Sequence, residues 1–350
     1  MRILFTKLRH IGDNLLLTPS VVAVKKAFPE AEIWVAVRRG TQGILAGCPE
    51  IDRLLVTARP EEGKRSGSES LADLGTLARV AATPFDYAFE LGDNDRGRLL
   101  AAASGARIRC TNSYQRPQGE PLTPFWKARF NRLVTTGHGP VHQVLRDYNA
   151  VREVLSLPVE PPGLRFARSA WRPHGLTLRD GEPYAVVHPA TRWSTKAWGI
   201  EKWRTVIGSL LGRFPRVVVS CGPSHDERAV AASLISGTDG RALTTDGSLS
   251  WAQMAHLLGH ASLFLGVDTA AMHLAAAVER PSIALFGNPP AYQYGPWKTA
   301  RRIVRARDSM EEKERILIPG EQLMEEIGAE MVLAAVEQLM ADQTEGTSRR

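Results

Sequence analysis

The chain has 350 residues, of which 43% are hydrophobic and 23% are charged, a composition typical of a globular protein rather than a disordered or fibrous one. This length is enough for two domains of ordinary size. Lysine and arginine total 44 and aspartate and glutamate 37, so the formal charge is +7. A basic balance favours an anionic partner but does not choose among nucleic acid, a membrane surface and a phosphorylated substrate.

Several protein classes are disfavoured by simple patterns. No run of eighteen apolar residues occurs, so we expect no transmembrane helix. The N-terminus lacks the apolar core of a signal peptide, and we therefore expect a cytoplasmic protein. The cysteines Cys48, Cys110 and Cys221 are widely spaced, which predicts buried free thiols rather than disulfides or a metal site.

The N-terminal half alternates between predicted strands and helices. A tight loop over 9–14 follows the first strand, and apolar residues at helical spacing then cover 15–28, where Pro19 predicts a kink or a fresh start. The polar stretch 58–69 is predicted to be an exposed, flexible loop. The predicted strands of this half are 2–8, 32–37, 51–57 and 87–91.

A less regular region, residues 111–144, follows and contains four prolines. Within it, residues 125–133 mix aromatic and basic side chains. Such a mixture suits an anionic membrane surface, although a partly buried surface helix with basic edges is the commoner case. A helix over 143–155 closes this half.

The second half repeats the alternation after a proline-rich segment. Its predicted strands are 184–188, 217–221, 263–267 and 282–286, and its predicted helices are 200–211, 227–235, 250–258 and 323–339. Alternating strands and helices predict an α/β fold with parallel sheets. The predicted domains are 1–160 and 176–340, joined by a linker over 161–175 and followed by a polar tail over 341–350.

The most informative stretch is residues 263–277. A short apolar run ends at Asp268 and Thr269, both good N-cap residues, and an alanine-rich helix with His273 one turn in comes next. The start of this helix is expected at the carboxyl end of a strand, where open α/β sheets bind ligands. Its free N–H groups and dipole favour a phosphate there.

Three weaker motifs follow other predicted strands. Asp13, in Gly12-Asp13, is either a helix cap or a carboxylate that accepts a proton. The hydroxyl-rich loop 191–198 contains Lys196, which either neutralises a diphosphate or is simply solvated. Glu227 either hydrogen-bonds a ribose or favours the dipole of its own helix.

Metal and dinucleotide motifs are weak or absent. Asp93-Asn94-Asp95 has a D-x-D pattern, but matches this short are common by chance. The pairs His138/His142 and His256/His260 have HxxxH spacing without the glutamate of a zinc protease. Neither G-x-G-x-x-G after the first strand nor a P-loop occurs, which argues against a dinucleotide oxidoreductase and a P-loop nucleotide hydrolase. We expect no bound metal and no resident cofactor.

Taken together, four segments resemble the ADP-heptose:lipopolysaccharide heptosyltransferase family, glycosyltransferase family 9. They occur in the order and spacing of that family, and the pattern in 192–198 is most like the branch that adds the third heptose. The segments are Gly12-Asp13 with Leu17-Thr18-Pro19, His188-Pro189 through Trp198, Gly222-Pro223 through Glu227, and Gly266 through Ala277 with Pro281 and Ala284 through Gly287. The resemblance implies the GT-B arrangement, in which two facing Rossmann-like domains with parallel sheets border a central cleft.

The resemblance also implies roles for individual residues. Asp13 would be the general base of an inverting transfer, with Arg9, His10 and Gly12 on the acceptor side. One departure is Ala270, where the family usually has glycine and where a methyl group would crowd the phosphate. The implied donor-binding residues are Thr191, Lys196, Glu227, Leu249, Asp268, Thr269, Ala270 and His273.

The partners that the resemblance implies are ADP-heptose and a phosphorylated lipid A–inner-core acceptor of a Gram-negative bacterium. A monomer in peripheral contact with the anionic cytoplasmic face of the inner membrane, without nucleic acid, is expected. Two other functions stay open from the sequence: a nucleotide-sugar epimerase of the same two-domain plan, and a basic nucleic-acid-binding protein. The second is disfavoured because bases and acids are interspersed along the chain.

Overall fold

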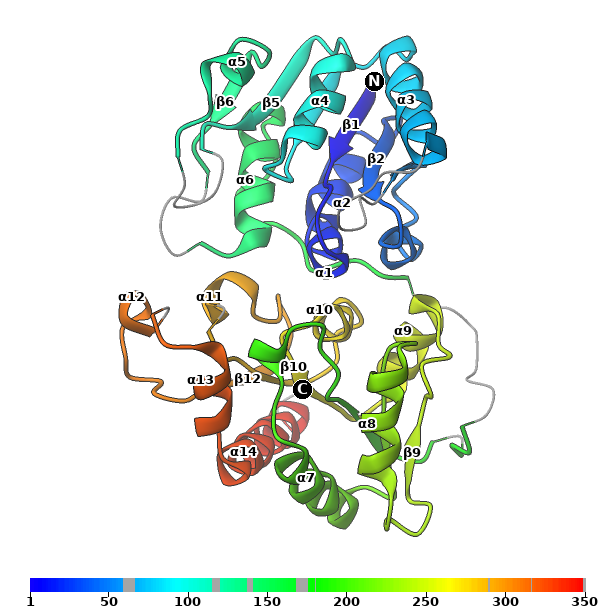
Figure 1. The fold of residues 1–350 in the computed structure, drawn as a ribbon, viewed down its shortest axis with the longest axis vertical. Coiled ribbons are helices and arrows are strands. Elements are labelled where there is room, and N and C mark those ends of the chain that lie inside the picture. Colours follow the sequence, from blue (N-terminus) through cyan, green and yellow to red (C-terminus); the bar gives the residue numbers. More distant parts are fainter. Residues whose placement is uncertain are drawn as a thin grey trace. The chain divides into compact units, whose positions relative to one another are not determined.

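Two parallel sheets organise the chain in the computed structural model, which describes residues 1–58, 67–114, 120–136, 141–167, 176–179, 181–288, 290–315 and 317–348. The chain divides into two compact units, Met1–Ala167 and Arg168–Arg350 (Figure 1). The division falls within the segment predicted as the linker. Each unit has its own sheet and its own apolar core.

The N-terminal unit contains a six-stranded parallel sheet in the order β3-β2-β1-β4-β5-β6 among its described residues. The central strand β1 therefore pairs with β2 on one side and with β4 on the other. Its strands are β1 Arg2–Thr6, β2 Glu32–Arg38, β3 Arg53–Thr57, β4 Tyr87–Glu90, β5 Ile108–Asn112 and β6 Arg132–Val134. Its helices are α1 Ile11–Leu15, α2 Thr18–Ala27, α3 Gly67–Ala82, α4 Asp95–Ala103, α5 Pro124–Lys127 and α6 Gln143–Leu155, with a 3₁₀ turn η1 at Gln42–Leu45.

The C-terminal unit repeats this topology in the order β12-β11-β10-β7-β8-β9. Its strands are β7 Tyr184–His188, β8 Arg216–Val219, β9 Ala242–Thr244, β10 Leu263–Val267, β11 Ser282–Leu285 and β12 Arg301–Val304. Its helices are α7 Ile200–Arg213, α8 His225–Ile235, α9 Trp251–His260, α10 Ala270–Ala277, α11 Ala291–Tyr294, α12 Glu312–Arg315, α13 Gly320–Glu326 and α14 Ala329–Ser348, with a 3₁₀ turn η2 at Ser194–Lys196. Every residue of β10 is buried, which agrees with its uninterrupted apolar sequence.

The predicted apolar strands are confirmed, but the segment after β1 is not a loop. Residues 11–15 form α1, so most of the predicted loop 9–14 is helical. A second helix, α2, starts at Thr18, and Pro19 occupies its first turn, where a missing N–H costs nothing. Pro19 therefore marks the fresh start rather than a kink.

Four short strands were not anticipated from the sequence: β5, β6, β9 and β12. Three of them, β6, β9 and β12, lie at sheet edges, where burial is partial and no apolar run is required. Helices α3 and α4 were also missed. The end of the predicted loop 58–69 belongs to α3 from Gly67 onward, while residues 59–66 lie outside the described part of the chain.

The predicted last helix, residues 323–339, is two helices, because α13 ends at Glu326 and α14 begins at Ala329 beyond Gly328. Residues 341–348 of the predicted polar tail continue α14. Across the described ranges, none of these helices is both long and apolar enough to cross a bilayer.

Candidate functional site

Each unit has one place where its strand order reverses, and the sequence motifs gather there. In the N-terminal unit this switch point lies between β1 and β4, and in the C-terminal unit between β7 and β10. Loops leaving the carboxyl ends of two such strands turn to opposite sides of the sheet, which opens a crevice for a ligand. The residues that follow β1, β7 and β10 are those singled out from the sequence.

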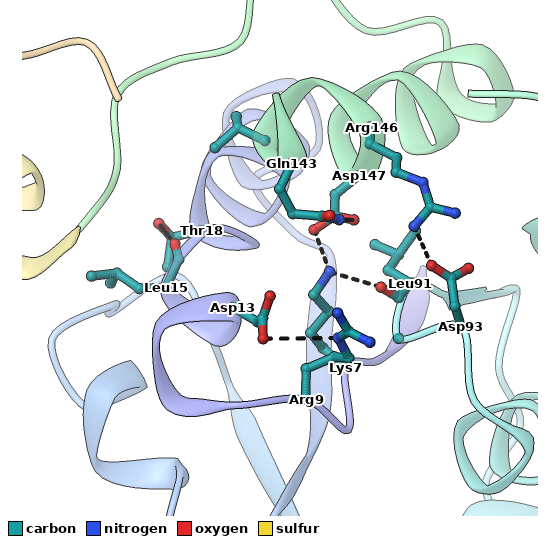
Figure 2. Close-up of polar contacts among 12 residues, drawn as sticks. Lys7, Arg9, Asp13, Leu15, Thr18, Leu91, Asp93, Gln143, Arg146 and Asp147 are labelled. Atoms are coloured by element: carbon teal, nitrogen blue, oxygen red, sulfur yellow. Dashed lines mark hydrogen bonds and ion pairs between the residues drawn. The ribbon is translucent and has the colours of Figure 1, made fainter. Parts of the chain in front are cut away.

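The loop after β1 brings together the predicted base and the predicted acceptor-side residues. Asp13 lies in the first turn of α1, and its Oδ2 accepts the backbone N–H of His10 at 3.2 Å. The Nε of Arg9 lies 3.8 Å from the same oxygen, and the Asp13 side chain is 10% exposed (Figure 2). Gly12 precedes Asp13 in this turn. The carboxylate is therefore held by two neighbours and still reaches the surface.

Behind this loop lies a buried ion pair that the sequence reasoning missed. The Nζ of Lys7 donates to Asp147 Oδ2 at 2.6 Å and to the carbonyl of Leu91 at 2.7 Å, and both charged side chains are almost fully buried. Gln143 Nε2 donates to the other Asp147 oxygen at 2.8 Å. Figure 2 shows Lys7 extending from β1 toward α6 and the end of β4. The available signal was a lysine interrupting the apolar run of residues 3–8.

This pair ties three elements together at the switch point. It joins the end of β1, the residue after β4 and the first turns of α6. Burial raises the pKa of Asp147, while the Lys7 ammonium and the Gln143 amide oppose that shift. A buried charge pair of this kind fixes geometry, because losing either partner leaves the other uncompensated.

The D-x-D pattern after β4 has structural partners rather than a metal-binding arrangement. Asp93 pairs with the buried Arg146 of α6, and Asn94 caps α4 by accepting the Gly97 N–H at 2.9 Å. Asp95 is 3.0 Å from Arg98. Within the described residues, no group of three histidine, cysteine, aspartate or glutamate side chains could hold a metal ion.

Only one of the two histidine pairs lies wholly within the described residues. His138 lies outside the described residues, so its pairing with His142 has no structural account. His256 and His260 stack with ring centroids 4.2 Å apart at the end of α9, and His260 Nδ1 lies 2.9 Å from the His256 carbonyl.

A second buried carboxyl, Glu90, ends β4. Thr111 Oγ1 donates to its Oε2 at 2.9 Å and the Gly92 N–H to its Oε1 at 2.9 Å. Burial raises the pKa of Glu90 to about 7, with a further rise from the charge of Asp93, against the opposing effect of Arg98. Burial therefore favours the protonated form of the Glu90 carboxyl.

In the C-terminal unit, an ion pair crosses the switch point near the surface. Lys196, in the turn after β7, places its Nζ 2.5 Å from Oδ2 of Asp268, which follows β10. The lysine side chain is 21% exposed and the aspartate 8%. Two residues that are 72 positions apart thus meet where a ligand of this fold class would lie.

The helix start beside this pair has the expected N-cap. Thr269 adopts an extended backbone before α10, and its hydroxyl makes no hydrogen bond to the helix it caps. Ala270 is the first residue of α10, and His273 lies buried one turn further on. The first-turn N–H groups of α10 therefore point out beside Lys196, the arrangement that suits a phosphate.

The remaining predicted donor residues lie along the same edge of the sheet. Thr191 shares the loop of Lys196, and its Oγ1 accepts the Trp193 N–H at 3.3 Å. Glu227 lies in the first turn of α8, after β8, and its carboxylate rests against Gly222, where any Cβ would be 2.1 Å from Oε2. Leu249 follows β9 and is half-buried.

The loop after β8, which leads to Glu227, contacts the loop after β9, which leads to Leu249. Gly247 has φ +63°, and a Cβ on it would lie 2.3 Å from the Gly222 carbonyl. Glycine is needed at this position for both the backbone conformation and the close approach. The loops after β8 and β9 are therefore in direct contact, and the structure places Thr191, Glu227 and Leu249 on neighbouring strand ends.

The strand that precedes Lys196 ends in a partly buried histidine, His188. His188 Nδ1 lies 2.9 Å from Ser220 Oγ on the adjacent strand end. Burial lowers the pKa of His188 to about 4, so the ring is uncharged at neutral pH. A neutral ring leaves Arg192 and Lys196 as the cations of the described loop after β7.

The family model and the relatives that match this chain are all described as glycosyltransferases. A family model described as glycosyltransferase family 9 (heptosyltransferase) matches residues 128–317. The chain is 30% identical to a protein of Escherichia coli named lipopolysaccharide heptosyltransferase 3, over 97% of this chain and 100% of the relative.

Solved structures resemble the whole chain. E. coli heptosyltransferase WaaC with ADP matches with a TM-score of 0.79 at 20% identity, covering 97% of this chain and 100% of that one. A structure of the same enzyme with ADP-2-deoxy-2-fluoro heptose matches with a TM-score of 0.77 at 20% identity, covering 97% and 99%. This likeness confirms the predicted GT-B fold class.

Proposed function

This chain belongs to glycosyltransferase family 9 and is a glycosyltransferase, and on that premise we propose that it transfers a heptose from ADP-heptose to the inner core of lipopolysaccharide. The observation that carries the proposal is its 30% identity, over nearly its full length, to a lipopolysaccharide heptosyltransferase 3. The same relative supports assigning the chain to the branch that adds the third heptose. We further propose that it acts as a monomer in the cytoplasm, at the inner face of the membrane.

In the proposed mechanism, the acceptor hydroxyl displaces ADP in one step, and the anomeric carbon is inverted. Asp13 takes the proton of that hydroxyl. Its support is geometric: the carboxylate is fixed by the His10 N–H and by Arg9, yet remains partly exposed at the end of β1. A positioned base of this kind contributes about 10²- to 10⁴-fold to a rate.

The donor is assigned to the C-terminal unit. Lys196 and the first-turn N–H groups of α10 would bind the diphosphate and stabilise the charge that grows on it as the bond to the sugar breaks. Asp268 holds Lys196 in place before the donor arrives. Glu227 would bind the ribose, and Leu249 would pack against the adenine. Thr191, Ala270 and His273 would line the same donor site.

The acceptor is assigned to the N-terminal unit. Arg9 and His10, beside Gly12 and Asp13, would meet the phosphorylated inner core. Binding of the anionic acceptor should therefore weaken as salt rises. Because Lys196 and the α10 N–H groups already supply positive charge, we propose that transfer needs neither a metal ion nor a cofactor, and that a chelator leaves the rate unchanged.

The test is a transfer assay with a deacylated inner-core oligosaccharide as acceptor. Mass spectrometry should detect the gain of one heptose with ADP-heptose and not with UDP-glucose, and NMR of the product should show inverted anomeric configuration. Incubation with ADP-heptose alone is the control, because an epimerase would release a free sugar without any acceptor. Failure to transfer in the presence of both substrates would overturn the proposal.

A further inference from the structure

The positive charge of the chain is concentrated in one stretch. Residues 96–146 contain nine lysines and arginines and one acidic residue, Glu120. The other 299 residues contain 35 basic and 36 acidic ones. The formal charge of +7 therefore comes entirely from this stretch of the N-terminal unit, although acids and bases are mixed elsewhere.

Part of this charge is neutralised inside the unit, and part is not. Arg96 pairs with Asp73, Arg98 with Asp95 and Glu90, and Arg146 with Asp93. Five other cations have no ion pair with a carboxylate of the described residues. They are Arg107, Arg109, Lys127, Arg129 and Arg132.

Two of the exposed large apolar side chains of the protein lie among these five cations. The short helix α5 is anchored in the core by Trp126, and Phe130 is buried just after it. Two residues flanking this pair face outward: Phe125 is 55% exposed, and Leu133 of the edge strand β6 is 40% exposed. Figure 1 shows α5 beside β6 at the end of the sheet. Arg132 and Leu133 are consecutive in β6 and point to opposite sides of the sheet, so the patch wraps around its β6 edge. We call this edge the α5–β6 face; its residues are Arg107, Arg109, Phe125, Lys127, Arg129, Arg132 and Leu133.

Internal contacts hold the α5–β6 face in shape. The guanidinium carbon of Arg129 lies 3.5 Å from the ring centroid of Phe125, and Arg129 Nη1 donates to the Phe125 carbonyl at 2.7 Å. Arg109 Nε donates to the Arg129 carbonyl at 2.8 Å. The exposed ring and its cations therefore form one ordered unit rather than independent surface side chains.

We propose that the α5–β6 face docks the protein on an anionic lipid bilayer. Phe125 and Leu133 enter the headgroup region, while the five cations remain at the level of the anionic headgroups. Aromatic and aliphatic side chains flanked by cations are the combination that binds such an interface, because apolar burial and charge attraction act together. The occupant is the lipid surface itself, and the inference does not depend on which sugar is transferred.

The test measures binding of the full chain to vesicles that contain no lipopolysaccharide. Sedimentation with vesicles of phosphatidylcholine and 30% phosphatidylglycerol should show binding, and pure phosphatidylcholine should show little. Since each lysine or arginine near an anionic surface contributes about a five-fold change in binding, Lys127→Gln/Arg129→Gln/Arg132→Gln should reduce partitioning about 100-fold. Phe125→Ser should reduce it about ten-fold.

Matched variants keep the test specific. Lys26→Gln/Arg39→Gln/Arg79→Gln removes three exposed cations elsewhere in the same unit, and Val159→Ser removes a 77% exposed apolar side chain. Both should bind nearly as the unchanged protein does. Equal losses in the two triple variants, full binding by Phe125→Ser, or no preference for anionic vesicles would each overturn the proposal.

A second readout separates this inference from the proposed function. Transfer to the deacylated acceptor takes place without a bilayer, so every variant of the α5–β6 face should keep the rate of the unchanged protein in that assay. Loss of vesicle binding with intact transfer supports docking by this face. Loss of both in the same variant would instead show that the face serves the reaction or the fold, and would overturn the proposal.

Discussion

The two units share one strand order, yet they place an ion pair at the switch point in opposite environments. In the N-terminal unit, the Lys7 and Asp147 side chains are 1% and 0% exposed, and Lys7 also binds the Leu91 carbonyl. In the C-terminal unit, Lys196 is 21% exposed and its partner Asp268 is 8% exposed. The same pair of residue types therefore serves two purposes.

The degree of burial determines whether the lysine of each pair can exchange its carboxylate partner for a ligand. A fully buried lysine with two acceptors cannot exchange either of them for a ligand without leaving a carboxylate unpaired in a region of low polarity. A partly exposed lysine can exchange its carboxylate for a phosphate, because solvent and the α10 N-terminus compensate Asp268. The first pair lies behind the loop that carries the proposed base, and the second lies at the proposed donor site.

The largest expected effect concerns Asp13, the proposed base in the N-terminal unit. Asp13→Asn keeps an oxygen for the His10 N–H but cannot take a proton, so the turnover number should fall about 10²- to 10⁴-fold while ADP still binds. Calorimetry measures the binding, and the transfer assay measures the turnover. Asp95→Asn, at a 75% exposed carboxylate of the same unit, is the control. A near-normal rate in Asp13→Asn would remove Asp13 from its assigned role.

The next largest effect is on the free energy of unfolding, to which the buried pair Lys7–Asp147 contributes. Lys7→Met should reduce the free energy of unfolding by about 3–5 kcal/mol, because Asp147 is left buried without its cation. Lys25→Met, which breaks the partly exposed pair with Asp52, should cost about 1 kcal/mol or less. Urea unfolding followed by tryptophan fluorescence compares the two variants. The double variant Lys7→Met/Asp147→Leu should recover much of the loss, and equal losses in both single variants would contradict this view of the pair.

The free energy of unfolding should depend on pH through His188 of the C-terminal unit. The folded-state pKa of His188, about 4, lies below its ordinary value of 6.5, so unfolding takes up a proton between these values. The contribution of His188 to the free energy of unfolding should therefore be complete above about pH 6.5 and fall by up to about 3 kcal/mol as the pH drops toward 4. His188→Asn should flatten this part of the profile of unfolding free energy against pH. Glu90→Gln removes a carboxyl whose pKa is raised instead, and it should change the slope in the opposite sense.

The smallest expected effect concerns the partly exposed pair Lys196–Asp268. Lys196→Gln should weaken ADP binding about 10- to 100-fold, because one charged contact to the diphosphate is lost while the α10 N–H groups remain. The unfolding free energy should change by only about 1 kcal/mol, since this pair is partly exposed. Isothermal titration gives the affinity. Lys202→Gln, at another partly exposed lysine of this unit, should leave ADP affinity unchanged.

The sequence by itself determined the α/β class, the main buried strands, the helix start at Thr269 and the placement of Asp13 and Lys196 after strands. These features depend on near neighbours: apolar runs, caps and turns are local properties of the chain. The short strands β6, β9 and β12 were not predicted, because a strand at a sheet edge needs no apolar run. The helix α1, which carries Asp13, was not predicted because a helix of five residues is too short to show a periodic pattern.

Only the tertiary structure decided which charges meet. Lys7 and Asp147 are 140 positions apart, and Lys196 and Asp268 are 72 apart. Lys196 and Asp268 come together because β7 is adjacent to β10, whereas Lys7 meets Asp147 because α6 packs beside the end of β1 (Figure 2). The sequence marks the ends of strands, but the order of strands in a sheet depends on packing between distant segments, and that packing also decides which lysine is buried and which can reach a ligand.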